Sequence, residues 1–152
     1  MATTERPTIV ADNREQIVYQ FTCPTIRGTL KTGDYGLADY ENQVAIEAKA
    51  LNDVVTCLGP QRDRFERELE RARSLEYFAV VIEGTFEDLA SGRYTSRLHP
   101  NSAVESISTF EIRYRIPFLF CGTRALAGRK CESLLRKFYR EKMLELDEWV
   151  PF

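Results

Sequence analysis

Two carboxylates and a lysine have the residue types and the spacing of a site for a divalent cation. Twelve residues separate Asp34 from Glu47, and Lys49 follows two positions later. Carboxylate oxygens are the ligands that hard cations such as Mg²⁺ prefer. Two neighbouring carboxylates repel each other unless a positive charge lies between them, so a bound cation would explain the pair. The alternative is a solvated hairpin, because these residue types are also common on exposed strands.

The turn between these residues determines whether the carboxylates meet. Residues 39–42 (DYEN) favour a turn. If the chain reverses in the middle of that turn, Ala38 pairs with Gln43 and Asp34 lies opposite Glu47. Directly opposed side chains on antiparallel strands are about 5 Å apart. The spacing therefore predicts a hairpin that brings both carboxylates within reach of one cation.

Alternation along the second strand of this hairpin separates the chemistry from the core. Successive side chains of a strand point to opposite faces. Val44, Ile46 and Ala48 therefore share one face, whereas Glu47 and Lys49 share the other. We expect the lysine to lie beside the carboxylates.

Three apolar runs predict further strands of a central sheet, over residues 8–11, 77–84 and 116–121. The second run, YFAVVIEG, is typical of a strand buried on both faces. Asp12 directly follows the first run. It is predicted either to cap a helix or to place a third acid at the C-terminal end of a central strand, where ligand crevices form in open sheets.

Helical periodicity is clearest in residues 63–76, where apolar residues recur at steps of four and three. Most arginines of this segment are balanced by glutamates at helical spacing, so we expect them on a solvated face. Arg62 and Arg64 lie at the end nearest Lys49 in sequence. These two are predicted to contact phosphate.

Two more helices follow in the second half of the chain. Ser102-x-x-Glu105 is a capping box that predicts a helix start, and Gly122-Thr123 leads into the last helix. Apolar stripes are expected to bury one side of each helix. They comprise Val104, Ile107, Phe110 and Tyr114 in the first, and Leu126, Leu134, Leu135, Phe138, Met143 and Leu144 in the second.

The composition is that of an ordinary globular protein, with 43% hydrophobic and 29% charged residues among 152. No apolar run reaches the roughly 18 residues of a membrane span, and the N-terminus lacks the apolar core of a signal peptide. We therefore expect a cytoplasmic or nucleoid-associated protein that is not secreted and has no membrane partner. Four cysteines without a C-x-x-C pair, and a single histidine, argue against a zinc site and for reduced thiols.

Strands that alternate with helices predict an α/β layered domain with right-handed crossovers. We expect a flexible N-terminus over residues 1–7, one domain over residues 8–145 and a C-terminal tail over residues 146–152. A net charge of −2 does not exclude a nucleic-acid partner, because the clustering of the 21 Lys and Arg residues matters more than their sum.

Three linked motifs carry a family resemblance: Asp12-x-Arg14-Glu15, Gly33-Asp34-Tyr35 and Glu47-x-Lys49-x-x-x-Asp53. In this order they resemble the nuclease domain of XPF and Hef, within the PD-(D/E)xK superfamily. Three motifs together are a specific signal, and the resemblance extends over residues 8–140. It implies a restriction-endonuclease-like fold, with a central mixed sheet flanked by helices.

The resemblance implies a structure-selective DNA endonuclease that hydrolyses one strand of flaps, forks or junctions. Asp34 and Glu47 would hold Mg²⁺ or Mn²⁺, and Lys49 would orient or activate the attacking water. A metal ion suits this chemistry because it lowers the pKa of its bound water and neutralises charge on the phosphate. Asp12 would join the metal network, and Arg14, Glu15 and Asp53 would support the site.

Ala48 departs from the family pattern, which has arginine at this position. Its small side chain either fills space on the core face of the strand or results from an engineered Arg→Ala change that disables cutting. The second explanation is favoured because the flanking residues otherwise follow the pattern. In both cases we predict that this chain cuts DNA weakly or not at all.

Dimerisation is typical of the family, so a homodimer is predicted. Phe110, Tyr114, Phe138 and Tyr139 are expected either in the core or in such an interface. The family commonly adds a helix-hairpin-helix module, which the acidic and aromatic tail does not resemble. The competing function is a non-catalytic DNA-binding or scaffolding module on the same fold. A third candidate is a sequence-specific nuclease of the restriction type.

Overall fold

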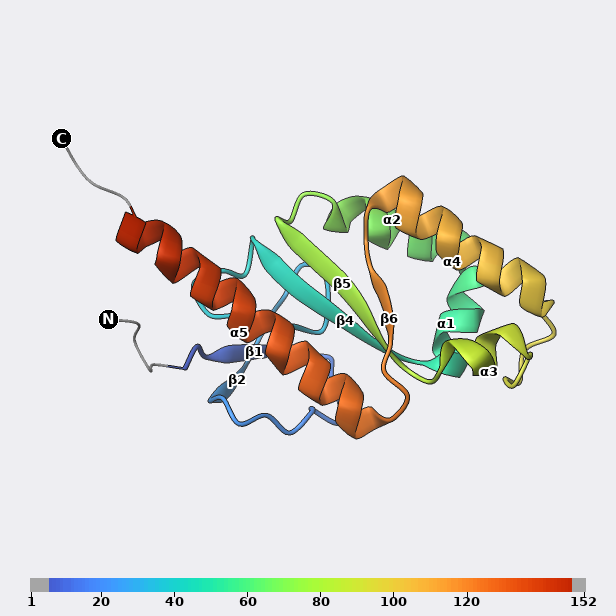
Figure 1. The fold of residues 1–152 in the computed structure, drawn as a ribbon, viewed down its shortest axis with the longest axis horizontal. Helices are drawn as coiled ribbons and strands as arrows, with labels where there is room; N and C mark the ends of the chain where they lie inside the picture. The colour runs from blue at the N-terminus through green and yellow to red at the C-terminus, as the bar shows by residue number, and fades with distance from the viewer. Residues whose placement is uncertain (1–5, 149–152) are drawn as a thin grey trace.

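A six-stranded sheet with helices on both faces forms the body of the protein, for which a computed structural model describes residues 6–148 (Figure 1). The predicted α/β class, a mixed sheet flanked by helices, is confirmed. The strands are β1 (Ile9–Asp12), β2 (Thr25–Gly28), β3 (Tyr35–Leu37), β4 (Val44–Ala50), β5 (Tyr77–Glu83) and β6 (Phe118–Phe120). The helices are α1 (Leu51–Leu58), α2 (Arg62–Ala72), α3 (Phe86–Ala90), α4 (Pro100–Tyr114) and α5 (Arg124–Glu148).

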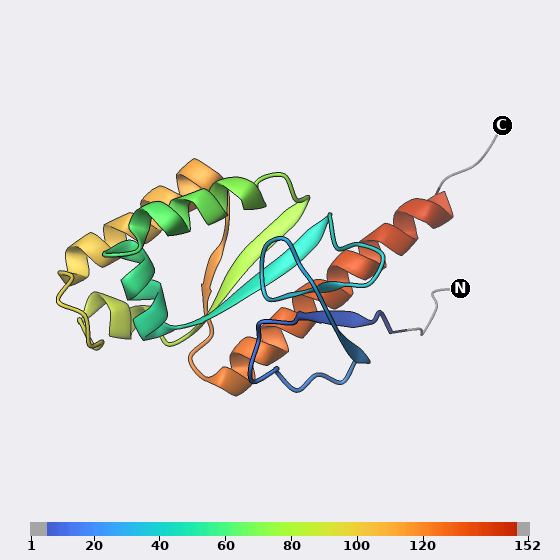
Figure 2. The ribbon, with the colours of Figure 1, turned by 180° about the vertical axis from the view of Figure 1, so that it is seen from behind.

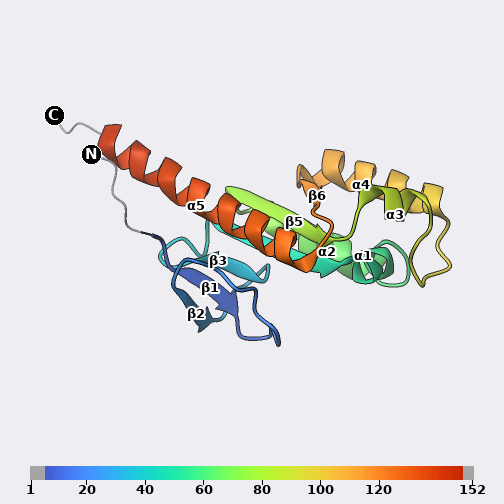
Figure 3. The ribbon, with the colours of Figure 1, turned by 60° about the horizontal axis from the view of Figure 1, so that its bottom comes forward.

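The strand order in the sheet is β2-β1-β3-β4-β5-β6. β3 runs antiparallel to both of its neighbours, β1 and β4. β4, β5 and β6 are parallel, as are β1 and β2. Parallel neighbours need crossover connections, which α1 with α2, and then α3 with α4, supply. Figure 3 shows β1 and β2 at one end of the molecule and α3 and α4 at the other. β4 therefore lies in the interior of the sheet.

Two hydrophobic cores lie on the two faces of the sheet. On one face, Ala45 and Val80 pack with residues of α1, α2 and α4. On the other face, Ile46 and Val81 pack with residues of α5. Seen from behind, the strands of the first half of the chain pass in front of α5 (Figure 2). The alternation predicted for residues 44–49 is confirmed, because consecutive residues of β4 belong to different cores.

The β3–β4 hairpin has the predicted register. Tyr35 pairs with Ile46, and one further step along the same register places Asp34 opposite Glu47. Gly33 precedes this pair with φ of 88°. A Cβ atom at Gly33 would lie 2.8 Å from a side-chain carbon of β4, so the close approach and the positive φ both require glycine.

Three elements of the first half differ from the sequence prediction. Residues 51–58, for which no element was expected, form α1. Its buried side chains Leu51, Val54, Val55 and Leu58 follow helical spacing, which is the signal that could have identified it. Residues 25–28 form the edge strand β2. α2 ends at Ala72, four residues before the predicted end of that helix.

The start of α4 also differs from the prediction. The helix begins at Pro100, two residues before the capping box at Ser102. The His99 side chain caps it by accepting a hydrogen bond from the Asn101 N–H (3.1 Å). Proline suits the first turn because its fixed φ is helical and its missing N–H needs no partner there.

α5 buries a different stripe from the predicted one. Ala127, Cys131 and Leu135, spaced by four residues, are buried against the sheet. Leu126 and Leu144, expected on the buried side, are 50% and 40% exposed. Small side chains at two of these three contacts let the helix approach the sheet closely, and they carry a weaker hydropathic signal than leucine.

The expected N-terminal tail, residues 1–7, lies mostly outside the described residues, and the expected C-terminal tail, residues 146–152, lies partly outside them. Within the described part, Pro7 is buried and α5 continues to Glu148. None of the helices between residues 6 and 148 is long and apolar enough to cross a membrane.

Candidate active site

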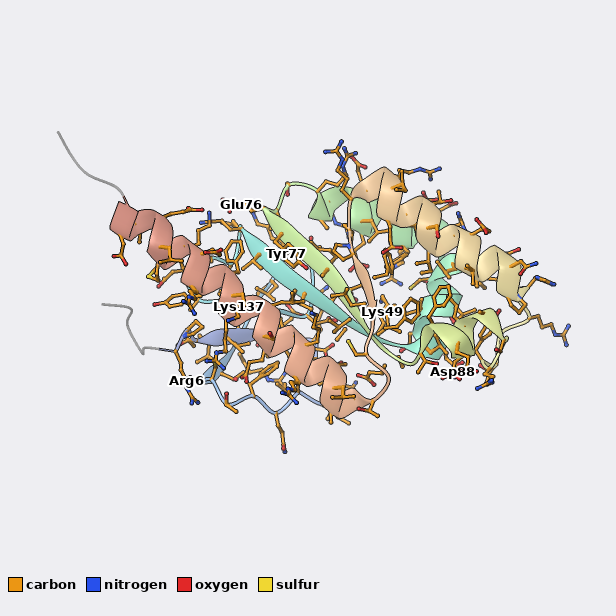
Figure 4. All side chains as sticks on the ribbon, in the orientation of Figure 1. Arg6, Lys49, Glu76, Tyr77, Asp88 and Lys137 are labelled. Carbon is orange, nitrogen blue, oxygen red and sulfur yellow. The ribbon has the colours of Figure 1, made fainter. Side chains whose placement is uncertain are left out.

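A cleft with a volume of about 420 Å³ lies beside the C-terminal half of β4. Glu47 and Lys49 project into it from β4, and Figure 4 labels Lys49 near the end of that strand. Residues 31–34, which lead into β3, form one wall. The beginning of α1 and one side of α2 form the other. The cleft thus lies on the sheet face opposite α5.

Glu47 is buried because β4 is an interior strand whose end is covered by α2. The residue is 7% exposed, and its Oε2 lies 3.0 Å from Nζ of Lys49. Burial raises the pKa of Glu47 well above its ordinary range, and the nearby Asp34 carboxylate raises it further. Burial also opposes the charge on Lys49, but the carboxylate of Glu47 outweighs it and the pKa of Lys49 is raised. Nζ of Lys49 lies 5.5 Å from the ring centroid of Phe65 in α2, so an aromatic side chain supports the lysine.

Asp34 lies at the start of β3 and joins the hairpin through its side chain. Its Oδ2 accepts a hydrogen bond from the backbone N–H of Ala48 (2.8 Å). Burial raises the pKa of Asp34 to about 7, although the Ala48 N–H opposes this shift. The carboxylate of Glu15 contributes to the same rise, and Glu15 in turn accepts a long hydrogen bond from the Tyr35 hydroxyl (3.5 Å).

The charges of this group favour a cation. Asp34 and Glu47 carry two negative charges when ionised, and Lys49 supplies one positive charge. The excess negative charge in a buried position is relieved either by a proton, as the raised pKa values indicate, or by a metal ion. Mg²⁺ is commonly bound through one or two carboxylates with water and substrate phosphate completing its shell.

This donor set fits a Mg²⁺ or Mn²⁺ ion held by Asp34 and Glu47. Each carboxylate uses one oxygen for a protein partner, Ala48 N–H or Lys49 Nζ, which leaves its second oxygen for the ion. Among residues 6–148, no three His, Cys, Asp or Glu side chains are arranged to hold a metal. The remaining ligands would therefore be water and phosphate oxygens.

Asp12 does not line the cleft, in contrast to its expected place in a metal network. Its Oδ1 accepts the Leu30 N–H (2.8 Å), and its Oδ2 accepts both the backbone N–H (3.0 Å) and Nε (2.6 Å) of Arg14. Burial alone would raise the pKa of Asp12, but these bonds lower it below its ordinary value. Residues 13–14 form a turn, so the alternative expectation of a helix cap is wrong. Asp12 instead fixes Arg14, whose side chain lines the cleft.

The two arginines predicted to contact phosphate have different surroundings. Arg64 lines the cleft, as does the predicted outer acid Asp53. Arg62 does not. Its guanidinium donates to the hydroxyl of Ser106 (2.7 Å) and lies 4.7 Å from the ring centroid of Phe110, both in α4. Arg62 therefore ties α2 to α4, and its position does not support contact with a substrate in the cleft.

Three charged residues that the sequence did not single out also line the cleft: Lys31, Glu68 and Arg71. Arg64, Glu68 and Arg71 are separated by four and three positions, so they share one side of α2. Glu68 lies close enough to Glu47 to contribute to its raised pKa through a carboxyl–carboxyl hydrogen bond. Helical spacing from Arg64 was the available signal. The expectation that the glutamates only balance the arginines hid it.

Ala48 points away from the cleft, toward the core beneath α5. Its backbone N–H still serves the site by binding Asp34. An arginine at this position would begin on the core side of the strand and pass around its edge to reach the cleft. The cavity lining therefore lacks any contribution from this side chain.

The aromatic residues considered for an interface are mainly structural. Phe110 and Tyr114 are 0% and 8% exposed and belong to the core beneath α4, so the structure places both in the core alternative. Phe138 and Tyr139 are half-buried, and both rings lie edge-on to the ring of Tyr40, at 6.2 Å between centroids. All four cysteines are free thiols, as expected for reduced residues.

Comparison with known proteins agrees with this architecture. The model of the ERCC4 domain matches residues 6–133, and no significant match is found among curated proteins. Among solved structures, XPF from Aeropyrum pernix has a TM-score of 0.70 and 18% identity over 96% of this chain and 66% of that chain. XPF from Aeropyrum pernix in complex with DNA has a TM-score of 0.70 and 19% identity over 90% of this chain and 66% of that chain. At this identity the structures show the fold, and the chain spans just under two thirds of their length. Since the family model matches most of the sequence, this protein belongs to the ERCC4 domain family, in agreement with its resemblance to XPF.

Proposed function

We propose that this chain is the nuclease domain of a metal-dependent endonuclease that hydrolyses phosphodiesters in branched DNA. The observation that carries the proposal is the buried group of Asp34, Glu47 and Lys49 inside a cleft lined by further cations. Membership of the ERCC4 domain family and the existence of a similar XPF structure in complex with DNA support it. The activity, substrates and partners of a larger protein remain within this proposal.

The residues of the cleft would have distinct roles in this reaction. Asp34 and Glu47 would hold the cation, which lowers the pKa of a bound water and offsets charge on the scissile phosphate when present. Lys49, kept charged by Glu47, would face the same phosphate and stabilise its developing negative charge. Its contact with Phe65 keeps the ammonium group at the end of β4.

The outer cations would position the substrate strand. Lys31 and Arg14 lie on one wall, and Arg64 and Arg71 lie on the other. Arginine and lysine at this spacing suit phosphates on either side of the scissile bond, and such contacts fix the register of a strand without reading its sequence. This arrangement favours recognition of DNA structure over recognition of bases.

Ala48 determines how active this particular chain would be. The family pattern has arginine at this position, and the alanine leaves the cleft without that guanidinium. Arginine binds phosphate in a bidentate manner that no alanine can replace. We therefore expect weak or absent cleavage by this chain, while the cation site remains.

The test is cleavage of a flap, a fork, a four-way junction and a plain duplex in Mg²⁺ or Mn²⁺. The chain and its Ala48→Arg variant are compared, and Ala48→Arg combined with Asp34→Ala is the control. We expect Ala48→Arg to cut branched substrates and the combined variant to be inactive. Equal cutting by all three would refute the proposed site. Structure-dependent DNA binding without cutting, and without a cation that depends on Asp34, would favour the scaffolding function instead.

A further inference from the structure

The outer side of α5 carries five cations at helical spacing. They are Arg129, Lys130, Arg136, Lys137 and Arg140, and we call them the α5 cation stripe. At 100° per residue, all five fall within an arc of about 120°. This arc is centred opposite the buried residues Ala127, Cys131 and Leu135, which face the sheet.

The stripe is exposed and is not neutralised by the protein. All five side chains are exposed, and none forms an ion pair with another residue in the described range 6–148. Other cations behave differently. Arg124 and Lys142, at the two ends of the same helix, pair with Glu83 and Glu76, and Arg113 pairs with Glu66.

Such a concentration of charge is unusual for this protein. The whole chain has a net charge of −2, yet no acidic side chain falls within the arc between residues 129 and 140. Glu132 lies outside the arc and binds Thr22 and Cys23 through both carboxylate oxygens. Repulsion among exposed like charges destabilises a helix slightly, and an anionic partner would relieve it.

The stripe lies on the opposite side of the molecule from the cleft. α5 packs on one face of the sheet and the cleft opens on the other. Figure 4 labels Lys137 on α5 and Lys49 at the end of β4. Helix, sheet and helix layers at about 10 Å spacing separate the two surfaces. A straight duplex seated in the cleft therefore cannot also run along the stripe.

We propose that the α5 cation stripe binds the phosphate backbone of a second arm of a branched DNA. This inference rests on the proposed function, because the first arm is the one that enters the cleft. Between Arg129 and Arg140 the helix advances about 16 Å, which is long enough to follow several phosphates of a duplex. Two surfaces on opposite faces are satisfied together only by DNA whose arms diverge, so the stripe contributes to selection of branched substrates.

Binding measured without cleavage tests the inference. Fluorescence anisotropy in EDTA follows a labelled three-way junction and a plain duplex of equal phosphate number, from 50 to 300 mM salt. The stripe variant is Arg136→Gln with Arg140→Gln. Each lost phosphate contact reduces the slope of log affinity against log salt by about 0.9. We expect a reduction of about 2 for the junction and less than half of that for the duplex.

The matched control is Arg97→Gln with Arg115→Gln, two exposed arginines remote from α5 that make the same change in charge. We expect it to leave the slope for the junction nearly unchanged. Equal slopes for the stripe and control variants would overturn the inference. It would also be overturned if the stripe variant changed the oligomeric state in sedimentation and left the slope intact, because α5 would then bind a second copy of the chain. The assay needs no catalysis, so inactivity of the cleft does not affect its reading.

Discussion

Replacing Asp34 with asparagine should stabilise the folded protein at alkaline pH in the absence of metal. The carboxyl group has a pKa of about 7 in the folded protein against an ordinary value of 3.8, mainly because it is buried. Between these pH values the folded protein retains a proton that the unfolded chain has released. The stability of the parent chain therefore falls as pH rises from about 4 to 7, and the full penalty persists above pH 7.

The size of the effect follows from that difference. Three pH units at about 1.4 kcal/mol each give an upper value of about 4 kcal/mol. The Ala48 N–H binds the carboxylate more strongly than it would bind an amide, which reduces the expected gain of Asp34→Asn to about 2 kcal/mol. For a domain of this size such a gain raises Tm by about 4–8 °C.

Urea denaturation in EDTA at pH 4 and pH 8 measures the change in the free energy of unfolding. We expect Asp34→Asn to match the parent chain at pH 4 and to exceed it at pH 8. Saturating Mn²⁺ at pH 8 should close the gap, because only the parent chain binds the ion tightly, and a concentration of 100 Kd stabilises by about 2.7 kcal/mol. A variant less stable than the parent at both pH values would refute the interpretation of Asp34 as a destabilising ligand held ready for a cation.

Three further predictions concern the cleft. Metal affinity should fall about tenfold per pH unit below pH 7, because a proton on Asp34 competes with the ion; calorimetric titration with Mn²⁺ between pH 5.5 and 8 measures this, and a flat profile would contradict it. Arg64→Gln with Arg71→Gln should reduce the salt slope of binding by about 2 for plain and branched DNA alike, whereas effects confined to junctions would contradict their place in the cleft. Arg62→Gln should cost about 1–2 kcal/mol of stability, through loss of the Ser106 hydrogen bond and the contact with Phe110, and should leave DNA affinity unchanged; the opposite pattern would place Arg62 in the interface.

Local pattern was sufficient wherever a residue's neighbours in sequence decide its environment. Alternation along residues 44–49 correctly assigned Ile46 to the core and Lys49 to the cleft side. The turn-forming residues 39–42 determined the register that brings Asp34 opposite Glu47. The apolar run 77–84 identified β5 because a strand buried on both faces is apolar throughout.

Roles that depend on distant partners were not predictable in this way. Arg62 and Arg64 are two residues apart and look equivalent in sequence, but α4 packs beside α2 and captures only Arg62. Asp12 has the residue type of a metal ligand, yet the Leu30 N–H and Arg14 occupy its oxygens. Such partners lie on other segments, so the spacing of residues in sequence does not reveal them.

The sequence by itself determined the chemistry: a carboxylate pair with a lysine, placed at the spacing of a hairpin, and the motifs of the ERCC4 domain family. The tertiary structure decided which charges serve that chemistry. It brought Glu68 and Arg71 into the cleft and turned the stripe of α5 to the opposite face. The physical reason is that strand alternation and turn geometry act between residues near in sequence, whereas burial and charge neutralisation depend on how separate helices pack against the sheet.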